Sequence, residues 1–297
     1  MIEVKGITKR FGDFTALDDL RLTVPTGAVY GLVGPNGSGK STIIRHITGI
    51  YRPDAGEILI DGQPVYENPQ TKARIAYIPD DVFYFNNASM REMAKFYAGI
   101  YPNFSWERFE KLLEIFPLDP KCPIRRFSKG MQKQAAFVLC IAMQPEIMVL
   151  DEPIDGLDPV MRRQVWSLVM ADIAERNTTV LVSSHNLREL EDVCDHVGIL
   201  DHGKLLLERS LSEMQENICK ILIALPDGTE LPTGLDILHK TSTGKLLTLI
   251  VRGKQEELTD YLNLAKPLFM DAVPLTLEEI FIYELGGVNY EVKNIIL

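Results

Sequence analysis

The amino-acid sequence predicts an α/β fold built on a doubly wound sheet. Two short apolar segments, Ile147–Leu150 and Thr179–Ser183, have the continuous hydrophobic pattern of buried parallel strands. Between them, Pro159–Ala174 has the length and spacing of a helix, so the three segments form a βαβ unit. A third apolar strand, Ala28–Val33, runs directly into a glycine-rich turn and a further helix. Strands that alternate with helices in this way predict a parallel sheet with helices packed on it.

The N-terminal part of the chain adds further strands. Ile2–Lys9 and Leu20–Val24 alternate apolar and polar residues, as half-buried strands do. After the glycine-rich turn, a helix is predicted over Lys40–Ile50, and the cluster Tyr51–Gly56 is typical of a turn. Two short strand candidates follow, Glu57–Ile60 and Arg74–Ile78.

The middle of the chain has a helical pattern from about 86 to 145, which predicts a helical insert between sheet elements. The predicted helices are Met90–Tyr101, Trp106–Phe116 and Met131–Met143. After about residue 210 the pattern changes: strand candidates Ile218–Ala224 and Lys245–Val251 lie on either side of the turn Pro226–Gly228, and helical patterns follow. We therefore expect a main domain over 1–210 and a small α+β appendage over 211–297.

Composition limits the function. The 297 residues include 41 Asp and Glu against 31 Lys and Arg, and the formal net charge of −10 has the wrong sign for a protein whose main partner is nucleic acid. The four cysteines lack metal-ligand spacing and no signal peptide is evident, which favours a reducing cytosol. The longest apolar run, Ala135–Met143, is far shorter than the about 20 residues that cross a bilayer. A membrane function therefore requires a partner.

The strongest functional signal is the glycine-rich turn between the strand Ala28–Val33 and the helix that begins at Lys40. Its glycine and lysine spacing is that of a phosphate-binding loop, in which backbone N–H groups and the helix N-terminus point at phosphate oxygens. We expect Lys40 to pair with the β- and γ-phosphates of ATP and Ser41 to bind Mg²⁺. The residues expected to contact the nucleotide here are Gly34, Pro35, Asn36, Gly37, Ser38, Gly39, Lys40, Ser41 and Thr42.

A second signal is the acidic pair Asp151 and Glu152, which directly follows the strand Ile147–Leu150. Open α/β sheets place their sites at the carboxyl ends of strands. We expect Asp151 to hold Mg²⁺ through water, and Glu152 to lie beside the γ-phosphate as the general base or as the group that orients water. An isolated acidic pair is often a solvated strand end, so the upstream phosphate loop is essential to this interpretation.

The sequence Phe127-Ser128-Lys129-Gly130-Met131-Gln132, at the start of a predicted helix, resembles the signature motif of ABC-transporter ATPases. The usual form is Leu-Ser-Gly-Gly-Gln; Ser128 and Gly130 match, and three positions differ. The resemblance implies a P-loop NTPase of the ABC ATPase fold, with a RecA-like lobe, an antiparallel β subdomain and a helical insert. It also implies a head-to-tail homodimer with two ATP molecules at the interface, in which Ser128 and Gly130 contact the γ-phosphate held by the other copy. A lone serine at a helix start is more often a plain N-cap.

Three further positions resemble the family. Asp158, at the end of Ile154-Asp155-Gly156-Leu157-Asp158, matches the D-loop, which implies a place at the dimer interface. His185, after the strand Thr179–Ser183, matches the switch histidine, which implies a contact with the γ-phosphate and a catalytic role. Phe11 matches the aromatic residue that stacks on adenine. His46 and His202 are interpreted as structural or exposed residues.

One position departs from the family pattern. ABC ATPases usually have Gln after the strand that here ends in Pro79, and this chain has Asp80, followed by Asp81. A carboxylate is a good ligand for Mg²⁺, but it is shorter than Gln and charged. Asp80 is therefore either a metal ligand acting through water or a solvated loop acid. The resemblance also implies that a coupling helix of the membrane partner docks beside this loop, around Phe83–Asn87.

The resemblance covers Ile2 to about Arg209, with its motifs in the family order, and the tail, including Leu275–Phe281, is similar to bacterial ATPases of the ABC-2 exporter type. It implies an ATP-binding and ATP-hydrolysing subunit, with ATP and Mg²⁺ as ligands. We expect it in the cytoplasm, peripheral on the inner face of the cell membrane, where it powers a separate transmembrane permease without a nucleic-acid partner. Two alternatives remain: a soluble ABC ATPase of translation or DNA repair, and a regulator that binds nucleotide without turnover. The single phosphate loop and acidic balance weigh against the former.

Overall fold

The computed structural model describes residues 1–297 except 214–217, 227, 230, 277–278, 280–282 and 284–297. The chain divides into two compact units. The first comprises Met1–His185 with Val193–Glu208, and the second comprises Asn186–Asp192 with Arg209–Leu297. The expected domain boundary between residues 210 and 211 is retained as a proposal.

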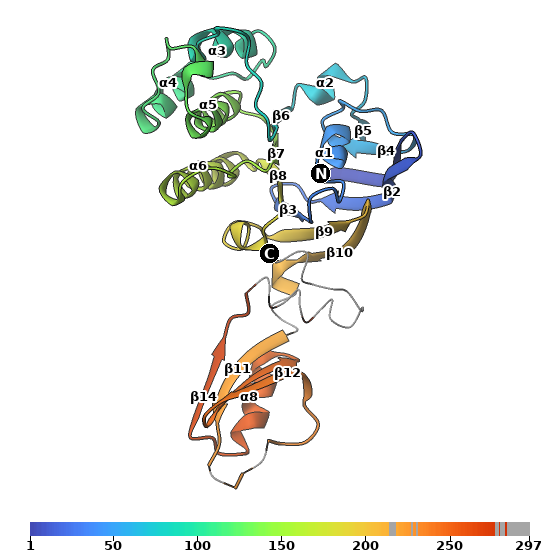
Figure 1. The fold of residues 1–297 in the computed structure, drawn as a ribbon, viewed down its shortest axis with the longest axis vertical. Coiled ribbons are helices and arrows are strands. Elements are labelled where there is room, and N and C mark those ends of the chain that lie inside the picture. The colour runs from blue at the N-terminus through green and yellow to red at the C-terminus, as the bar shows by residue number, and fades with distance from the viewer. Residues whose placement is uncertain (214–217, 227, 230, 277–278, 280–282, 284–297) are drawn as a thin grey trace. The chain divides into compact units, whose positions relative to one another are not determined.

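The central sheet of the first unit has six strands in the order β10-β9-β3-β8-β7-β6 (Figure 1). Their bounds are β3 (Val29–Val33), β6 (Ile75–Ile78), β7 (Ile147–Asp151), β8 (Thr179–Ser184), β9 (His196–Asp201) and β10 (Lys204–Ser210). The pairs β6–β7, β7–β8, β8–β3 and β3–β9 are parallel. Every residue of β3, β7 and β8 is buried, which explains their continuous apolar sequences.

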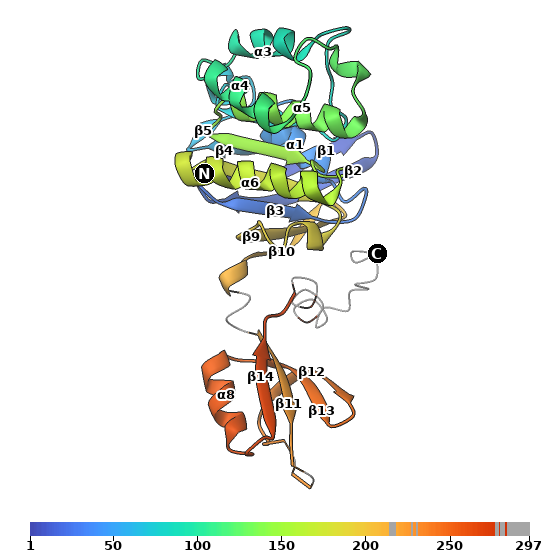
Figure 2. The same ribbon diagram turned by 90° about the vertical axis from the view of Figure 1, so that its left-hand side faces the viewer.

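Helices α1 (Lys40–Ile47) and α6 (Pro159–Arg176) lie on opposite sides of these strands (Figures 1 and 2). The predicted doubly wound α/β sheet is therefore confirmed. Helix α1 is shorter than predicted: it ends at Ile47, and Gly49 follows with a φ of 67° in the left-handed region, which does not continue an α-helix.

The second sheet of this unit is antiparallel, in the order β2-β1-β4-β5. Its strands are β1 (Ile2–Phe11), β2 (Phe14–Val24), β4 (Ala55–Ile60) and β5 (Gln63–Pro64), and the short helix α2 (Pro69–Lys72) follows. Strand β2 begins at Phe14 rather than at the predicted Leu20, because register shifts in its pairing with β1 break the simple alternation. The two sheets and α1 share one hydrophobic core, which includes Leu22, Leu32 and Ile43.

The helical insert consists of α3 (Met90–Ala98), α4 (Trp106–Ile115), the 3₁₀ turn η1 (Ile124–Arg126) and α5 (Lys129–Ala142), which lie together in both views (Figures 1 and 2). Local chemistry sets where these helices start. Ser89 and Glu92 form a reciprocal capping box at α3, and Ser105 and Ser128 cap α4 and α5.

The second unit contains an antiparallel sheet in the order β12-β13-β11-β14 and the helix α8. The bounds are β11 (Ile218–Ala224), β12 (Asp236–Thr243), β13 (Leu246–Arg252), α8 (Gln255–Asn263) and β14 (Phe269–Val273). It has its own core, which includes Ile223, Leu249 and Leu262. Part of the predicted turn Pro226–Gly228 and most of Leu275–Phe281 lie outside the described residues.

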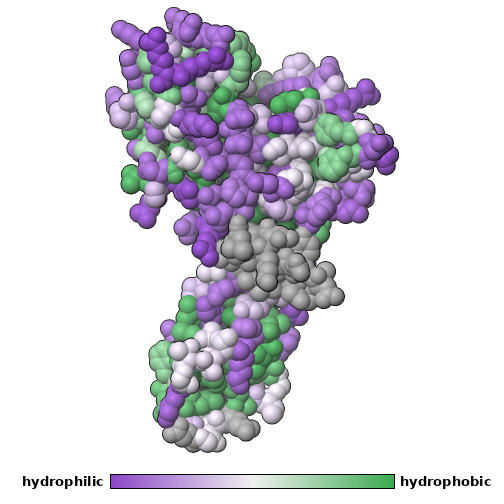
Figure 3. Space-filling model, in the orientation of Figure 1, coloured by the Kyte–Doolittle hydropathy of each residue, from purple (hydrophilic) through white to green (hydrophobic). Residues whose placement is uncertain are grey.

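The surface of the first unit is mainly hydrophilic on the face drawn in Figure 3. Among the helices in the described ranges, none has both the length and the apolar composition of a membrane span.

Candidate functional site

The predicted phosphate loop lies between the end of β3 and the start of α1, and the structure requires glycine at two of its positions. A Cβ atom on Gly34 would lie 2.1 Å from the carbonyl oxygen of Leu200. Gly39 precedes α1 with a φ of 112°, a conformation strained for residues with a side chain. The loop can therefore turn tightly into α1.

Lys40 is buried over this loop. Its Nζ donates hydrogen bonds to the carbonyl oxygens of Gly34 at 2.6 Å and Pro35 at 3.3 Å. The same atom is 3.4 Å from Oε1 of Glu152. The ammonium group thus lies between the phosphate loop and the acidic end of β7.

A cavity of about 340 Å³ opens in front of the loop, and residues from five segments line it. They are Phe11, Phe14, Ala16, Asn36, Gly37, Gly39, Lys40, Ser41, Thr42, Asp80 and Glu152. Phe11 is 46% exposed and contacts the ring of Tyr51 edge-on at 5.8 Å between centroids. Sequence reasoning missed Phe14, which pairs with Phe11 across the β1–β2 hairpin and is 64% exposed. Its position two residues after Gly12 was the available signal.

One buried atom tests whether a phosphate group fits this site. Ser38 Oγ is buried without a hydrogen-bond partner among the described residues, whereas nearly all buried hydroxyls have one. A phosphate oxygen could accept this hydrogen bond, and Lys40 supplies positive charge on the same loop. The donor set therefore fits the triphosphate of ATP.

The acidic pair at the end of β7 has a constrained backbone. Asp151 is buried, and its Oδ1 accepts a hydrogen bond from Ser183 Oγ at 2.7 Å. Glu152 has a φ of 47°, in the left-handed region, and its N–H donates to Ser183 Oγ at 3.0 Å. Non-glycine residues held in this conformation cost on the order of 1–3 kcal/mol and cluster at functional sites.

His185 follows β8 and contacts the same glutamate. Its Nδ1 is 2.9 Å from Glu152 Oε2, and its backbone N–H donates to that oxygen at 3.3 Å. The three residues assigned catalytic roles from the sequence therefore lie together: Lys40 and His185 contact the two carboxylate oxygens of Glu152.

The three candidate Mg²⁺ ligands do not form a closed metal cage. Ser41 and Asp80 line the nucleotide cavity, and Asp151 is buried beside it. In the described ranges, no group of three or more His, Cys, Asp or Glu side chains is arranged to hold a metal ion. Mg²⁺ at this position would therefore take several ligands from phosphate oxygens and water, as it commonly does.

The environment of Asp80 is acidic. Burial raises the pKa of its carboxyl group, and the nearby ammonium group of Lys133 opposes this rise. The pKa is raised further by the negative charges of Asp81, Asp151 and Glu152. Lys133 Nζ is 3.8 Å from Asp80 Oδ1. The side chain of Asp80 is 58% exposed, so both interpretations of this residue, a metal ligand acting through water and a solvated loop acid, stay open.

Sequence reasoning also missed Lys133, on α5. Its Nζ donates a hydrogen bond to the carbonyl oxygen of Glu152 at 2.9 Å. The available signal was its position three residues after Gly130, on the helix that begins within the signature motif.

The signature and D-loop residues lie apart from the nucleotide cavity of their own chain. Ser128 and Asp158 are exposed N-caps, of α5 and α6, and their side-chain oxygens accept backbone N–H groups. Neither they nor Gly130 line the cavity. A Cβ on Gly130 would meet its nearest neighbours at 3.8 and 3.9 Å, so packing within the chain does not require glycine there.

The two histidines that we interpreted from the sequence as structural or exposed residues lie outside the nucleotide cavity. His46 is buried, its Nδ1 is 2.7 Å from the carbonyl oxygen of Thr42, and burial lowers its pKa. His202 has a 91% exposed side chain and pairs with Asp201.

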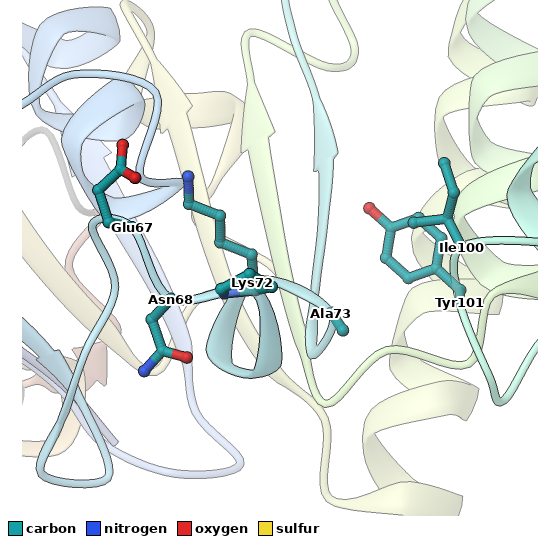
Figure 4. A pocket seen from close by; sticks show the side chains of 7 residues that line it. Glu67, Asn68, Lys72, Ala73, Ile100 and Tyr101 are labelled. Carbon is teal, nitrogen blue, oxygen red and sulfur yellow. The ribbon is translucent and has the colours of Figure 1, made fainter.

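A larger cavity, of about 400 Å³, lies between α2 and the end of α3 and shares no residue with the nucleotide cavity. Figure 4 shows Glu67, Asn68, Lys72 and Ala73 on one side of it and Ile100 and Tyr101 on the other.

Exposed aromatic rings also occur on the first unit. Phe83, Phe85 and Phe96 are 68%, 45% and 43% exposed, and Phe85 contacts the other two rings edge-on. We call these three residues the aromatic cluster.

Comparison with known proteins gives consistent matches. The family profile described as ABC transporter matches residues 17–155. The ABC transporter ATP-binding protein YtrB of Bacillus subtilis is 32% identical over 288 residues, which is 97% of this chain and 99% of that protein. The daunorubicin/doxorubicin resistance ATP-binding protein DrrA of Streptomyces peucetius is 32% identical and matches over 73% of this chain and 67% of that protein. A solved ATP-binding subunit of an ABC transporter superposes with a TM-score of 0.67 at 29% identity, over 72% of this chain and 92% of that one.

Proposed function

This chain belongs to the ABC transporter family as an ATP-binding subunit that hydrolyses ATP, and from that premise we propose that it powers export through a separate transmembrane permease by ATP-driven closure of a head-to-tail homodimer. The main support for hydrolysis at this site is that Lys40 and His185 contact the two carboxylate oxygens of Glu152 beside the phosphate loop.

Within one chain, ATP would lie with its adenine against Phe11 and its phosphates over the residues 34–42. Lys40 would turn from Glu152 toward the β- and γ-phosphates, which frees Glu152 Oε1 to orient the attacking water or accept its proton. His185 holds the other oxygen, Oε2, so the carboxylate keeps its direction. Mg²⁺, held by Ser41 with Asp151 and Asp80 through water, would neutralise charge on the phosphate oxygens.

The homodimer is supported by the residues that the cavity leaves out. Ser128, Gly130 and Asp158 lie outside the nucleotide cavity of their own chain, and the first and last are exposed. The N-terminus of α5 is a suitable anion site, because the first turn of a helix and the positive end of its dipole favour negative charge. We assign it to the γ-phosphate bound by a second copy.

Export and membrane association are supported by the relatives and by the surface. DrrA is named for drug resistance, which fits an exporter. The aromatic cluster lies on and beside the loop where family members bind their membrane partner, and exposed aromatic rings make good anchors. We place the chain in the cytoplasm at the inner face of the membrane, without a nucleic-acid partner.

The decisive test is Glu152→Gln. ATP binding should persist while hydrolysis falls to near zero, because the phosphate contacts remain and the carboxylate is lost. ATP should then trap a dimer, which size-exclusion chromatography with light scattering would detect. Glu107→Gln, on the exposed surface of α4, is the matched control and should behave as the unaltered chain. Normal turnover by Glu152→Gln would remove Glu152 from this role.

Fractionation of cells tests the membrane partner. Retention in the membrane fraction with an integral membrane protein is expected. Nuclease-sensitive co-purification with ribosomes or DNA would instead support the translation or repair class and contradict this proposal.

A further inference from the structure

We propose that Lys133 is a positioning residue for ATP hydrolysis, whose ammonium group joins the backbone of Glu152 to the carboxylate of Asp80 so that the helical insert sets the position of the catalytic side chain. This inference rests on the role proposed above for Glu152 and names what aligns it.

The contacts of Lys133 define this role. It projects from α5 of the helical insert, and its side chain is 12% exposed. Its Nζ donates to the carbonyl oxygen of Glu152 at 2.9 Å and lies 3.8 Å from Asp80 Oδ1. The backbone N–H of Asp155 also points at the Glu152 oxygen, but at 3.4 Å it is the weaker donor.

The backbone of Glu152 needs such support. Its φ of 47° is unfavourable for a glutamate and persists only if the surroundings determine it. Ser183, on β8, holds the N–H of Glu152, and Lys133, on α5, holds its carbonyl group. The peptide groups on both sides of the catalytic residue are thus held from two different elements.

Charge gives Lys133 a second task. Lys133 lines a cavity of about 290 Å³ together with three carboxylates, those of Asp80, Asp81 and Asp155, and one further lysine, Lys129. The carboxylates of Asp151 and Glu152 add negative charge near Asp80, and the ammonium group of Lys133 offsets part of it. Such interactions are stronger at a partly buried position than in bulk water.

Lys133 also lies next to the anchor of the aromatic cluster. Tyr84, between Phe83 and Phe85, is buried, and its hydroxyl donates to the carbonyl oxygen of Gln132 at 2.6 Å. Gln132 directly precedes Lys133 on α5. A partner that displaces the exposed phenylalanines would therefore act on the helix turn that holds Glu152.

Steady-state kinetics of Lys133→Met test the inference, because methionine keeps most of the apolar stem and removes the charge. We expect kcat to fall at least about tenfold, since small misplacements of a reacting group have large effects on rate. KM for ATP and the affinity for a non-hydrolysable analogue should stay within about twofold, because Lys133 does not line the nucleotide cavity. Lys133→Arg should recover most of the turnover.

Two further variants separate positioning from general damage. Lys111→Met removes another lysine that pairs with a glutamate on the insert, but an exposed one, and should leave kcat unchanged. In a double-mutant cycle, Asp80→Asn should lower turnover less in the Lys133→Met chain than in the unaltered chain, because the pair is already broken.

The outcomes distinguish this inference from the proposed function. Unchanged kcat in Lys133→Met, a parallel loss of ATP affinity, no recovery by Lys133→Arg, or independent effects in the cycle would each overturn it. Normal turnover by Glu152→Gln would instead overturn the role of Glu152. An inactive Glu152→Gln variant together with a fully active Lys133→Met variant would leave the proposed function in place and remove only the role of Lys133.

Discussion

Lys40 and Glu152 compensate each other's charge within the chain. Both side chains are nearly buried, at 6% and 13% exposure, so each charge needs a partner of opposite sign when no nucleotide is bound. A lysine that only reached outward for phosphate would be dispensable for stability. Here the replacement of Lys40 would leave a shielded carboxylate that keeps, in the described part of the chain, its contact with the side chain of His185.

At the scale of single residues, substitution of Asp80 tests whether its carboxylate helps to bind Mg²⁺. Asp80→Ala should raise the Mg²⁺ concentration that gives half-maximal ATPase activity, because a carboxylate facing the cavity is lost. Asp80→Gln should recover part of the loss by restoring the residue that the family usually has. Asp81→Ala is the matched control, since Asp81 does not line the nucleotide cavity. A Mg²⁺ titration that is the same for all variants would show that Asp80 is not a ligand.

At the scale of elements, one buried ion pair joins α4 to α6. Arg108 pairs with Asp172, whose side chain is fully buried. Burial raises the pKa of the Asp172 carboxyl group, and the charge of Glu175 raises this pKa further. The positive charges of Arg108 and Arg176 lower it, as does a hydrogen bond that Thr178 Oγ1 donates to the carboxylate. The charged carboxylate is therefore tolerated mainly because arginines face it.

Arg108→Met should lower the free energy of unfolding by about 3 kcal/mol near pH 8, because a buried charge loses its partner. A raised native pKa means that the folded state binds a proton at pH values where the unfolded state does not. The loss should therefore shrink as the pH falls toward 5 and the carboxyl group becomes neutral. Urea denaturation at both pH values measures this.

The exposed pair Arg91–Glu110 on the same insert provides the control. Arg91→Met should cost less than about 1 kcal/mol, with little dependence on pH in this range. Equal losses for the two variants would contradict the structural role of the Arg108–Asp172 pair.

At the scale of the whole molecule, the head-to-tail dimer predicts complementation. Lys40→Ala disables the phosphate loop and Ser128→Arg disables the signature, so each homodimer lacks both sites. A mixed dimer keeps one intact site, formed by the unaltered loop of one copy and the unaltered signature of the other. Mixing the two inactive proteins should restore ATPase activity, whereas sites contained within one chain would stay inactive.

The aromatic cluster makes a second prediction at this scale. Phe83→Ala or Phe85→Ala should weaken retention of the membrane subunit in pull-down experiments, because exposed rings at the partner surface are lost. Basal ATPase activity of the isolated chain should remain. Trp106→Ala, an exposed aromatic on α4, is the control. Unchanged retention of the membrane subunit by both phenylalanine variants would place its docking surface elsewhere, and the appendage after Ser210 would be the next surface to test.

Much of the fold could be predicted because it depends on hydrophobic patterns within short segments of the sequence. The apolar runs of β3, β7 and β8 have no polar alternation, and a strand buried on both faces explains this directly. Strands β12 and β14 were not predicted. Their residues are mostly exposed or half-buried, so hydrophobic periodicity does not mark them, and pairing within the sheet decides their conformation.

The sequence by itself determined the α/β class and the phosphate loop, because the loop depends on glycines and a helix start that lie within nine consecutive residues. Only the tertiary structure decided which groups meet at Glu152. Its contacts with Lys133 and His185 span 19 and 33 residues of sequence, and its contact with Lys40 spans more. Such contacts depend on how α1, α5, β7 and β8 pack, and no local spacing encodes that arrangement.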